Sequence, residues 1–302
     1  MTNRTISQSK GDEFARLAGP CQDGAVLLPL RPLTVGELLD TAVSLLRAHG
    51  RALLPVAAVL AAIEQALLAP LRLAADVEPP AYLPDFPQLR EMELYWVMLA
   101  TGAATEVTII ALLGGLTARA AGADILGQRP TARQLLRPRG GRFLAVAVVA
   151  VVAGVAMFVA ALAGPAWFAV YGLLGLAAPA VVLDQLGPGR ALRRSAGLAC
   201  RAGLRAAGIR ILGYVAWLAI RVALGLGAYA ALDALRLGGA EWTALMSALA
   251  WLLVNTVAYP TLACLDAVLH LETRMRTEGL DILLSRARHR GPLTPALLGV
   301  AR

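Results

Sequence analysis

Residues 143–163 read FLAVAVVAVVAGVAMFVAALA, an apolar run without a charged, amide or hydroxyl side chain. An α-helix rises about 1.5 Å per residue, so a run of this length crosses about 30 Å, the thickness of the hydrocarbon core of a bilayer. Gly164-Pro165 follows directly and is a strong turn signal. A second apolar run then begins at Ala166. The stretch therefore predicts a hairpin of two transmembrane helices.

Apolar runs of this kind make up most of the chain. Of its 302 residues, 58% are hydrophobic and 16% are charged, and the mean hydropathy is +0.65, which is typical of a membrane protein. Six runs are long enough to cross a bilayer: 52–71, 94–118, 143–163, 166–186, 211–235 and 243–270. We expect an all-α fold, a polytopic transmembrane helix bundle of about six spans.

The charges of the loops predict the orientation. The loops at 119–142 and 187–210 each carry six arginines, whereas the loop at 72–93 is mainly acidic. Positively charged loops stay in the cytoplasm, so we expect both termini inside and residues 76–91 outside. We expect flexible cytoplasmic tails at 1–30 and 286–302, flanking a membrane domain at 31–285. Nearly all the basic residues are arginine, with Lys10 the single lysine, which favours a GC-rich bacterial genome and hence a bacterial cytoplasmic membrane.

A helix start is predicted at Thr34, because Thr34 and Glu37 have the spacing of a capping box. From there to residue 51, apolar and polar side chains occupy opposite helix faces, which favours an interfacial helix lying on the cytoplasmic side of the membrane. Short arginine-bearing stretches also precede the other helix pairs, at 129–142 and 188–210. They are either three copies of one repeat or the ordinary layout of a six-helix protein.

Three segments resemble an actinobacterial-type family of multipass membrane proteins, similar to the membrane region attached to some glycerophosphoryl diester phosphodiesterases. They are Leu30–Asp40 (LRPLTVGELLD), Val182–Ser195 (VLDQLGPGRALRRS) and Glu272–Asp281 (ETRMRTEGLD). The resemblance implies a membrane architecture and residence in the membrane, and it does not imply catalysis. His289-Arg290-Gly291 matches the tripeptide that opens the phosphodiesterase catalytic domains, but we expect a basic tail here, because the 11 residues that follow cannot form a barrel.

Four polar residues inside the apolar runs are candidate site residues: Glu64, Glu106, Arg221 and the neutral Asn255. A charged group at the bilayer centre is costly by roughly 3 kcal/mol or more, so each is either functional or paired across helices. Glu106 and Arg221 both fall near the midplane when counted from the ends of their spans, which predicts an ion pair between them. Structural pairing and a role in transport or proton relay both stay open.

The arginines at 190–205 form a candidate surface for anionic lipid headgroups or an acidic protein partner. If the segment is one helix, they fall within about 120° of one another on the helical wheel. They are Arg190, Arg193, Arg194, Arg201 and Arg205.

The sequence favours no enzyme, metal site, cofactor or nucleic-acid partner. Asp266, His270 and His49 are the one possible metal corner, and Ser195 lacks a positioned base, so we expect neither metal binding nor acyl chemistry. We therefore predict a non-catalytic integral membrane protein, a scaffold or accessory subunit with a basic cytoplasmic face. The alternatives are a small-molecule or ion transporter that uses the intramembrane charges and an intramembrane lipid enzyme, which would need a clustered acid, base and nucleophile.

Overall fold

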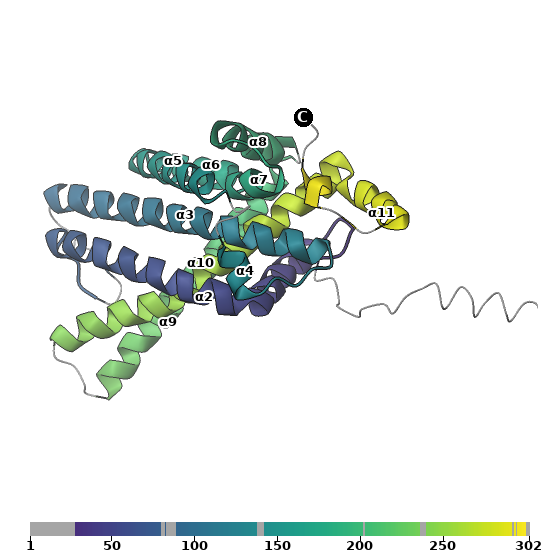
Figure 1. Ribbon diagram of the computed structural model, residues 1–302. Coiled ribbons are helices and arrows are strands. Elements are labelled where there is room, and N and C mark those ends of the chain that lie inside the picture. Colours follow the sequence, from purple (N-terminus) through teal and green to yellow (C-terminus); the bar gives the residue numbers. More distant parts are fainter. Residues whose placement is uncertain are drawn as a thin grey trace, which may run out of the picture.

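A computed structural model describes residues 28–79, 82, 89–137, 142–201, 203–235, 240–291, 293 and 295–299. The helices in chain order are α2 (Val35–Ala74), α3 (Leu89–Ile125), α4 (Ala132–Leu136), α5 (Phe143–Leu162), α6 (Ala166–Leu174), α7 (Ala177–Leu183), α8 (Pro188–Arg201), α9 (Arg205–Ala234), α10 (Ala240–Glu278), α11 (Leu280–Arg290) and the short 3-10 helix η1 (Pro295–Leu298) (Figure 1). Six helical segments of this described part are long and apolar enough to cross a membrane, which confirms the predicted all-α bundle with about six spans.

Helix α2 begins as predicted and then continues without a break. Thr34 and Glu37 form the full capping box, each side chain bonded to the backbone N–H of the other. The residues expected to form a separate interfacial helix at 34–51 are instead the first turns of α2, and this prediction is corrected. No proline stands between Thr34 and Pro55, and the helix continues through Gly50, so the amphipathic turns extend the first span. At 40 residues α2 is about 60 Å long, twice the hydrocarbon thickness, and its first turns pack against α10 beyond the apolar region.

The second and third spans, α3 and α5, approach closely through a small residue. A side chain at Gly154 would overlap the hydroxyl of Thr108, whose Oγ1 donates to the carbonyl of Ala104 at 2.8 Å. Further out, Trp96 Nε1 donates to the carbonyl of Ala161 at 3.0 Å. These contacts fix the register of α3 against α5, with small residues allowing close packing as in many membrane helix pairs.

The fourth span is broken into α6 and α7. Pro179 lacks a backbone N–H and its ring excludes the carbonyl four residues earlier, that of Gly175, where α6 ends. The turn at Gly175-Leu176 also leaves room for the guanidinium of Arg210, into which a side chain at position 175 would project. The continuous span expected at 166–186 is thus two half-helices in line.

The basic stretch at 188–210 is also divided. Gly203 and Leu204 both adopt positive φ, of 62° and 61°, so the chain turns between α8 and α9. Helix α8 keeps an amphipathic character, burying Ala191, Ser195 and Leu198. The three stretches considered as repeats take three forms: the start of a span in α2, the five residues of α4, and the separate helix α8.

The chain beyond residue 285 differs from the predicted flexible tail. Helix α11 continues to Arg290, and Leu298 in η1 is buried, with its carbonyl accepting from Arg274 Nη1 at 2.6 Å. Leu28, inside the predicted N-terminal tail, is buried as well. Apolar side chains and a buried arginine dock both segments on the bundle, so the folded part extends past the boundaries at 30 and 285.

Candidate functional site

The side chains of Glu106 on α3 and Arg221 on α9 form a buried ion pair. Arg221 Nη2 lies 2.7 Å from Glu106 Oε1, and Nη1 lies 3.2 Å from Oε2. The two residues are only 6% and 5% exposed. The ion pair predicted from their depth is therefore confirmed, and it offsets the cost of each charge in hydrocarbon.

Glu64 on α2 is held by neutral groups. Its carboxylate accepts hydrogen bonds from the hydroxyl of Thr105 at 3.2 Å, from Asn255 Nδ2 at 3.1 Å and from the hydroxyl of Tyr259 at 2.6 Å. Thr105 belongs to α3, and the other two donors belong to α10. No ion pair to Glu64 is present in the described part of the chain, although it is only 3% exposed.

A cavity of about 230 Å³ separates the helix pair α2–α3 from the pair α9–α10, and we call it the crevice. Glu64, Arg221 and Asn255 line it, and Glu106 is one contact away through Arg221. Figure 1 shows the α9–α10 hairpin diverging from α2 and α3 toward the tips of these helices. The structure thus brings together all four candidate residues from inside the predicted spans, from four helices.

Two polar atoms in the crevice wall are buried without a hydrogen-bond partner among the described residues. They are Nε of Arg221, a donor, and Oδ1 of Asn255, an acceptor. The orientation of the Asn255 amide follows from its neighbour, because a carboxylate accepts only and so must face the NH₂ group. Unsatisfied buried groups are costly, so a ligand or water that reached these two atoms would be stabilised by them.

Sequence reasoning missed a second buried pair, Arg210–Asp266. Arg210 Nε lies 2.7 Å from Asp266 Oδ1 and Nη2 lies 3.1 Å from Oδ2, and the guanidinium stacks 3.8 Å from the ring centre of Tyr171. Arg210 was assigned to the basic loop, but α9 begins five residues before it. The position of Asp266 within the apolar run at 243–270 was the available signal.

An aromatic stack connects this pair to the crevice. The rings of Tyr171 and Tyr214 lie 4.9 Å apart between centres, and the guanidinium of Arg221 lies 5.5 Å from the centre of the Tyr214 ring. Arg210, Tyr171, Tyr214 and Arg221 therefore follow one another through the bundle. Each arginine is stabilised both by a carboxylate and by a ring face.

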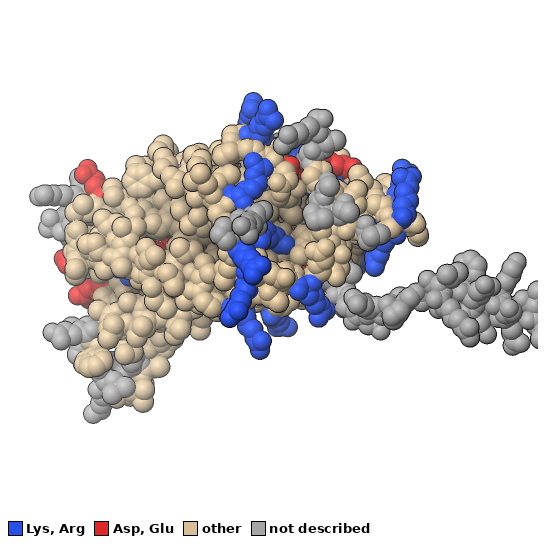
Figure 2. Space-filling model, in the orientation of Figure 1, with Lys and Arg blue, Asp and Glu red and all other residues tan. Residues whose placement is uncertain are grey.

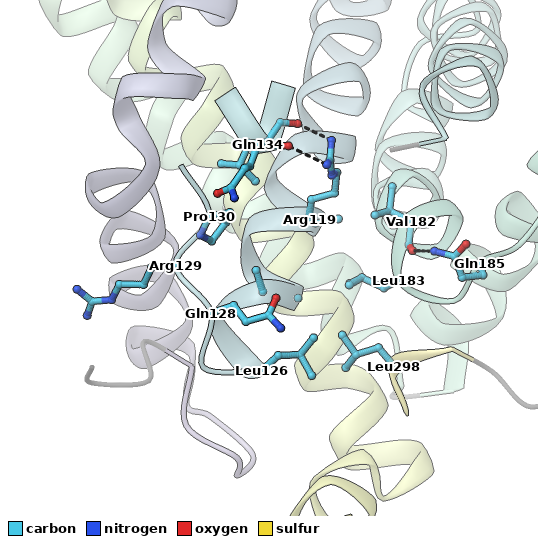
Figure 3. Close-up of a pocket in the computed structure, with 14 residues that line it drawn as sticks. Arg119, Leu126, Gln128, Arg129, Pro130, Gln134, Val182, Leu183, Gln185 and Leu298 are labelled. Carbon is cyan, nitrogen blue, oxygen red and sulfur yellow. Dashed lines mark hydrogen bonds between the residues drawn. The ribbon is translucent and has the colours of Figure 1, made fainter. Parts of the chain in front are cut away.

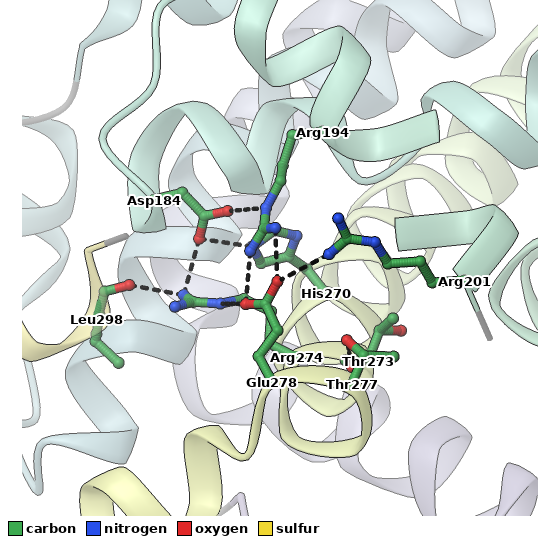
Figure 4. A network of polar contacts seen from close by, with 9 residues as sticks. All are labelled: Asp184, Arg194, Arg201, His270, Thr273, Arg274, Thr277, Glu278 and Leu298. Atoms are coloured by element: carbon green, nitrogen blue, oxygen red, sulfur yellow. Dashed lines mark hydrogen bonds and ion pairs between the residues drawn. The ribbon is translucent and has the colours of Figure 1, made fainter. Parts of the chain in front are cut away.

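A larger network lies at the other end of the bundle, around Asp184 (Figure 4). The Asp184 carboxylate accepts from Arg194 Nε at 3.0 Å, from Arg274 Nη1 at 2.8 Å and from His270 Nε2 at 3.1 Å. Glu278 pairs with both arginines. Burial would raise the pKa of Asp184, but His270 and Arg274 outweigh this effect and lower the pKa to about 2. The network joins α7, α8, α10 and η1.

The three segments that carry the family resemblance meet at this end. The carbonyl of Leu33 accepts from Arg205 Nη2 at 2.9 Å and from Arg276 Nη2 at 2.7 Å, and both arginines also pair with Glu272. Asp184, in the middle segment, forms an ion pair with Arg274 of the last segment. These motifs therefore tie the first, fourth and last spans together.

This network corrects the predicted arginine surface. Arg194 and Arg205 turn inward to carboxylates on other helices, and Arg205 belongs to α9, across the turn, so the five residues do not share one helix face. Arg190, Arg193 and Arg201 stay exposed, and Arg201 lies 3.7 Å from Glu278. Figure 2 shows basic side chains over the middle and right of the molecule, and acidic ones both at the left tip and at the upper right.

The residues considered for metal binding and acyl chemistry have separate structural partners. His49 Nε2 lies 3.2 Å from Asp124 Oδ2, while His270 and Asp266 bind the different partners given above. The part of the chain described by the structure contains no cluster of three metal-ligating side chains. Ser195 is fully buried and donates its hydroxyl proton to the carbonyl of Leu173.

A second cavity, of about 480 Å³, lies at the basic end between α3, α4 and α7 (Figure 3). The guanidinium of Arg119, which lines this cavity, already donates hydrogen bonds to the carbonyls of Gln134, Leu135 and Arg137 at the end of α4. Arg129 extends away from the other lining side chains. This cavity therefore offers little free positive charge for an anion.

Six candidate spans built around buried charge pairs define the chain as a multipass α-helical membrane protein. Comparison with protein-family models, with curated proteins and with solved structures finds no match to it. The resemblance to the phosphodiesterase-associated membrane family therefore stays a prediction based on the three segments.

Proposed function

We propose that this chain is a non-catalytic membrane transporter that takes a small polar molecule into the crevice. One observation carries the proposal: Glu64, Arg221 and Asn255 line a single cavity and Glu106 adjoins it, with two unpartnered atoms in its wall. Unpartnered buried atoms also occur elsewhere in the described part of the bundle, on Tyr171, Arg210, Ser247 and His270, but only Arg221 and Asn255 have theirs beside this cavity, where a ligand could bind them.

Cysteine accessibility tests whether the crevice is an aqueous site. Gly102 lines the crevice, and a Cβ there would meet only Leu68, at 3.9 Å, so Gly102→Cys is tolerated sterically. We expect a charged, impermeant thiol reagent to label it, because the reagent reaches only water-filled space. This variant and the control described next are made in a protein from which the exposed Cys200 has been removed.

Val155→Cys is the matched control. The contacts between α3 and α5 place Val155 at about the depth of Gly102, and its side chain is exposed outside the bundle, where we expect lipid. It should stay unlabelled. Equal labelling of both positions, or of neither, would contradict an aqueous crevice.

A second candidate is the scaffold or accessory subunit predicted from the sequence. It is supported by the three exposed arginines of α8 and by the apolar outer surface of the α9–α10 hairpin, including Leu224, Leu249 and Leu253. Each basic group near an anionic membrane contributes about 1 kcal/mol, so these arginines suit headgroups.

Its test compares two triple variants by the amount of anionic lipid that stays bound during purification. Changing Arg190, Arg193 and Arg201 to Gln should lower the amount of bound anionic lipid. Changing Arg286, Arg288 and Arg290 on α11 to Gln removes the same amount of charge and should lower the bound lipid less. Equal losses would show that net charge, and not the α8 surface, holds the lipid.

The proposal that the chain is not an enzyme rests on the arrangement of its reactive groups. The buried carboxylates other than Glu64 are paired with basic side chains, and the buried Ser195 has a carbonyl as its partner. An acyl or phosphoryl transfer site needs a nucleophile beside a base and open to substrate.

A further inference from the structure

We propose that the crevice binds a small primary ammonium compound, with the carboxylate of Glu64 as its counter-ion and Asn255 Oδ1 as a second acceptor. This inference rests on the proposed function and adds the chemical class of the ligand. It follows from three features of the crevice: an uncompensated carboxylate, free acceptor positions beside it, and an aromatic wall.

The first feature is the charge balance. Six carboxylates in the described residues are buried: Glu64, Glu106, Asp124, Asp184, Asp266 and Glu272. All except Glu64 have a basic partner. The charge of Arg221, the basic group nearest to the crevice interior, is already balanced by Glu106. Four of these carboxylates pair with arginines and Asp124 pairs with His49, whereas Glu64 has no basic partner in the described part of the chain, so a cation bound beside it would supply one.

Arg72 also lines the crevice but lies at its mouth. It is eight residues after Glu64 on α2, about 12 Å along the axis, and it donates to Gln65 Oε1 at 2.9 Å while stacking over the ring of Tyr82. Asp76 and Glu78 follow it, exposed at the same end of the molecule, where Figure 2 shows acidic side chains. The approach to the crevice therefore attracts cations.

The second feature is the set of free acceptors. A carboxylate has about four acceptor positions, and the donors on Asn255 and Tyr259 use two of those of Glu64. The single hydroxyl proton of Thr105 is shared between Glu64 and the nearer carbonyls of Thr101 and Gly102. The carboxylate therefore has acceptor capacity left, and Asn255 Oδ1, buried and unpartnered on the amide whose Nδ2 binds Glu64, is a second acceptor. A primary ammonium has three N–H donors and can use both, whereas a quaternary ammonium has none.

The third feature is the wall. Tyr95, Tyr214, Trp251 and Tyr259 line the crevice together with Met98 and Leu99. Aromatic faces attract cations, and the apolar side chains suit a short hydrocarbon or aromatic body. At about 230 Å³ the crevice is below the usual size of a drug site, so the ligand is small.

The test uses phenethylammonium as the probe, with 2-phenylethanol and 3-phenylpropionate as its neutral and anionic counterparts. Binding is measured by titration calorimetry on the full chain in nanodiscs of neutral lipid. We expect phenethylammonium to bind most tightly and Glu64→Gln to weaken it about tenfold or more, as for loss of a charge-assisted hydrogen bond. The matched control Glu78→Gln, at the same end but outside the crevice, should change binding less than about threefold. Thermal melting confirms that both variants fold.

Binding unchanged by Glu64→Gln, or tighter binding of the propionate, would overturn the ammonium assignment. Gly102→Leu, which fills the crevice, separates this failure from that of the proposed function. If the neutral or anionic compound binds best and Gly102→Leu abolishes it, the crevice is a ligand site of another class. If Gly102→Leu changes the binding of none of the three compounds, both proposals are wrong.

Discussion

Replacing Glu106 by Leu should destabilise the bundle strongly, because it strands the charge of Arg221 in a site that is only 5% exposed. Both terminal nitrogens of Arg221 bind Glu106 and Nε lacks a partner, so the guanidinium would be left without a carboxylate acceptor. Breaking a buried pair by removing one partner costs about 3–5 kcal/mol. We expect about 3 kcal/mol, the lower end, because the crevice beside Arg221 can admit water. Arg221→Met should lower the unfolding free energy by about as much, since it leaves the buried Glu106 without a basic partner.

The double variant should cost no more than either single change, because two apolar side chains of similar volume replace the pair. The loss of unfolding free energy in the double variant should therefore be smaller than the sum of the two single losses by about 3 kcal/mol or more. The measurement is unfolding of the purified protein in mixed micelles. As a control, Arg221→Met combined with Glu272→Leu should be additive within about 0.5 kcal/mol, because Glu272 pairs elsewhere. A double variant that loses the full sum, about 6 kcal/mol, would refute the pairing.

Three further predictions concern the rest of the molecule. Because the folded-state pKa of Asp184 is lowered to about 2, its contribution to stability is complete above its unfolded pKa of about 4 and is lost as the pH falls through that window. In this pH range the unfolding free energy of Asp184→Asn should depend less on pH than that of the unchanged protein. The same dependence in both proteins would contradict this prediction. Gly175→Ala should destabilise by about 1–3 kcal/mol, because its methyl group meets a buried guanidinium, whereas Gly208→Ala, with open space around it, should be neutral or stabilising in chemical unfolding. For topology, a cysteine at position 85, which lies outside the described residues, should react with an impermeant reagent in intact cells, and one at the exposed Arg137 should not; the reverse pattern would invert the orientation.

The arginines illustrate how far sequence reasoning reached. Arg221 stands inside an apolar run, so its cost in hydrocarbon pointed to a buried partner, and Glu106 was the acid at matching depth. Arg194 and Arg205 stand among other arginines near the ends of spans, where the same side chain can extend to water or turn inward. Their partners Asp184 and Glu272 lie up to 67 residues away in sequence, so no local pattern indicated the choice.

The number of spans, the hairpin at Gly164-Pro165, the capping box at Thr34 and the intramembrane ion pair follow from the sequence alone. Lipid offers no hydrogen bonds to the backbone, so spans and turns show as local apolar and turn patterns. The ion pair links distant residues, but the high cost of a charge in hydrocarbon and the depth of each residue in its own span predicted it. Only the tertiary structure decided that α2 continues through its amphipathic turns, that Arg210 pairs with Asp266, and that Glu64, Asn255 and Arg221 line one crevice. These features depend on which helices become neighbours and on how far they diverge, and that is set by packing between residues distant in the chain.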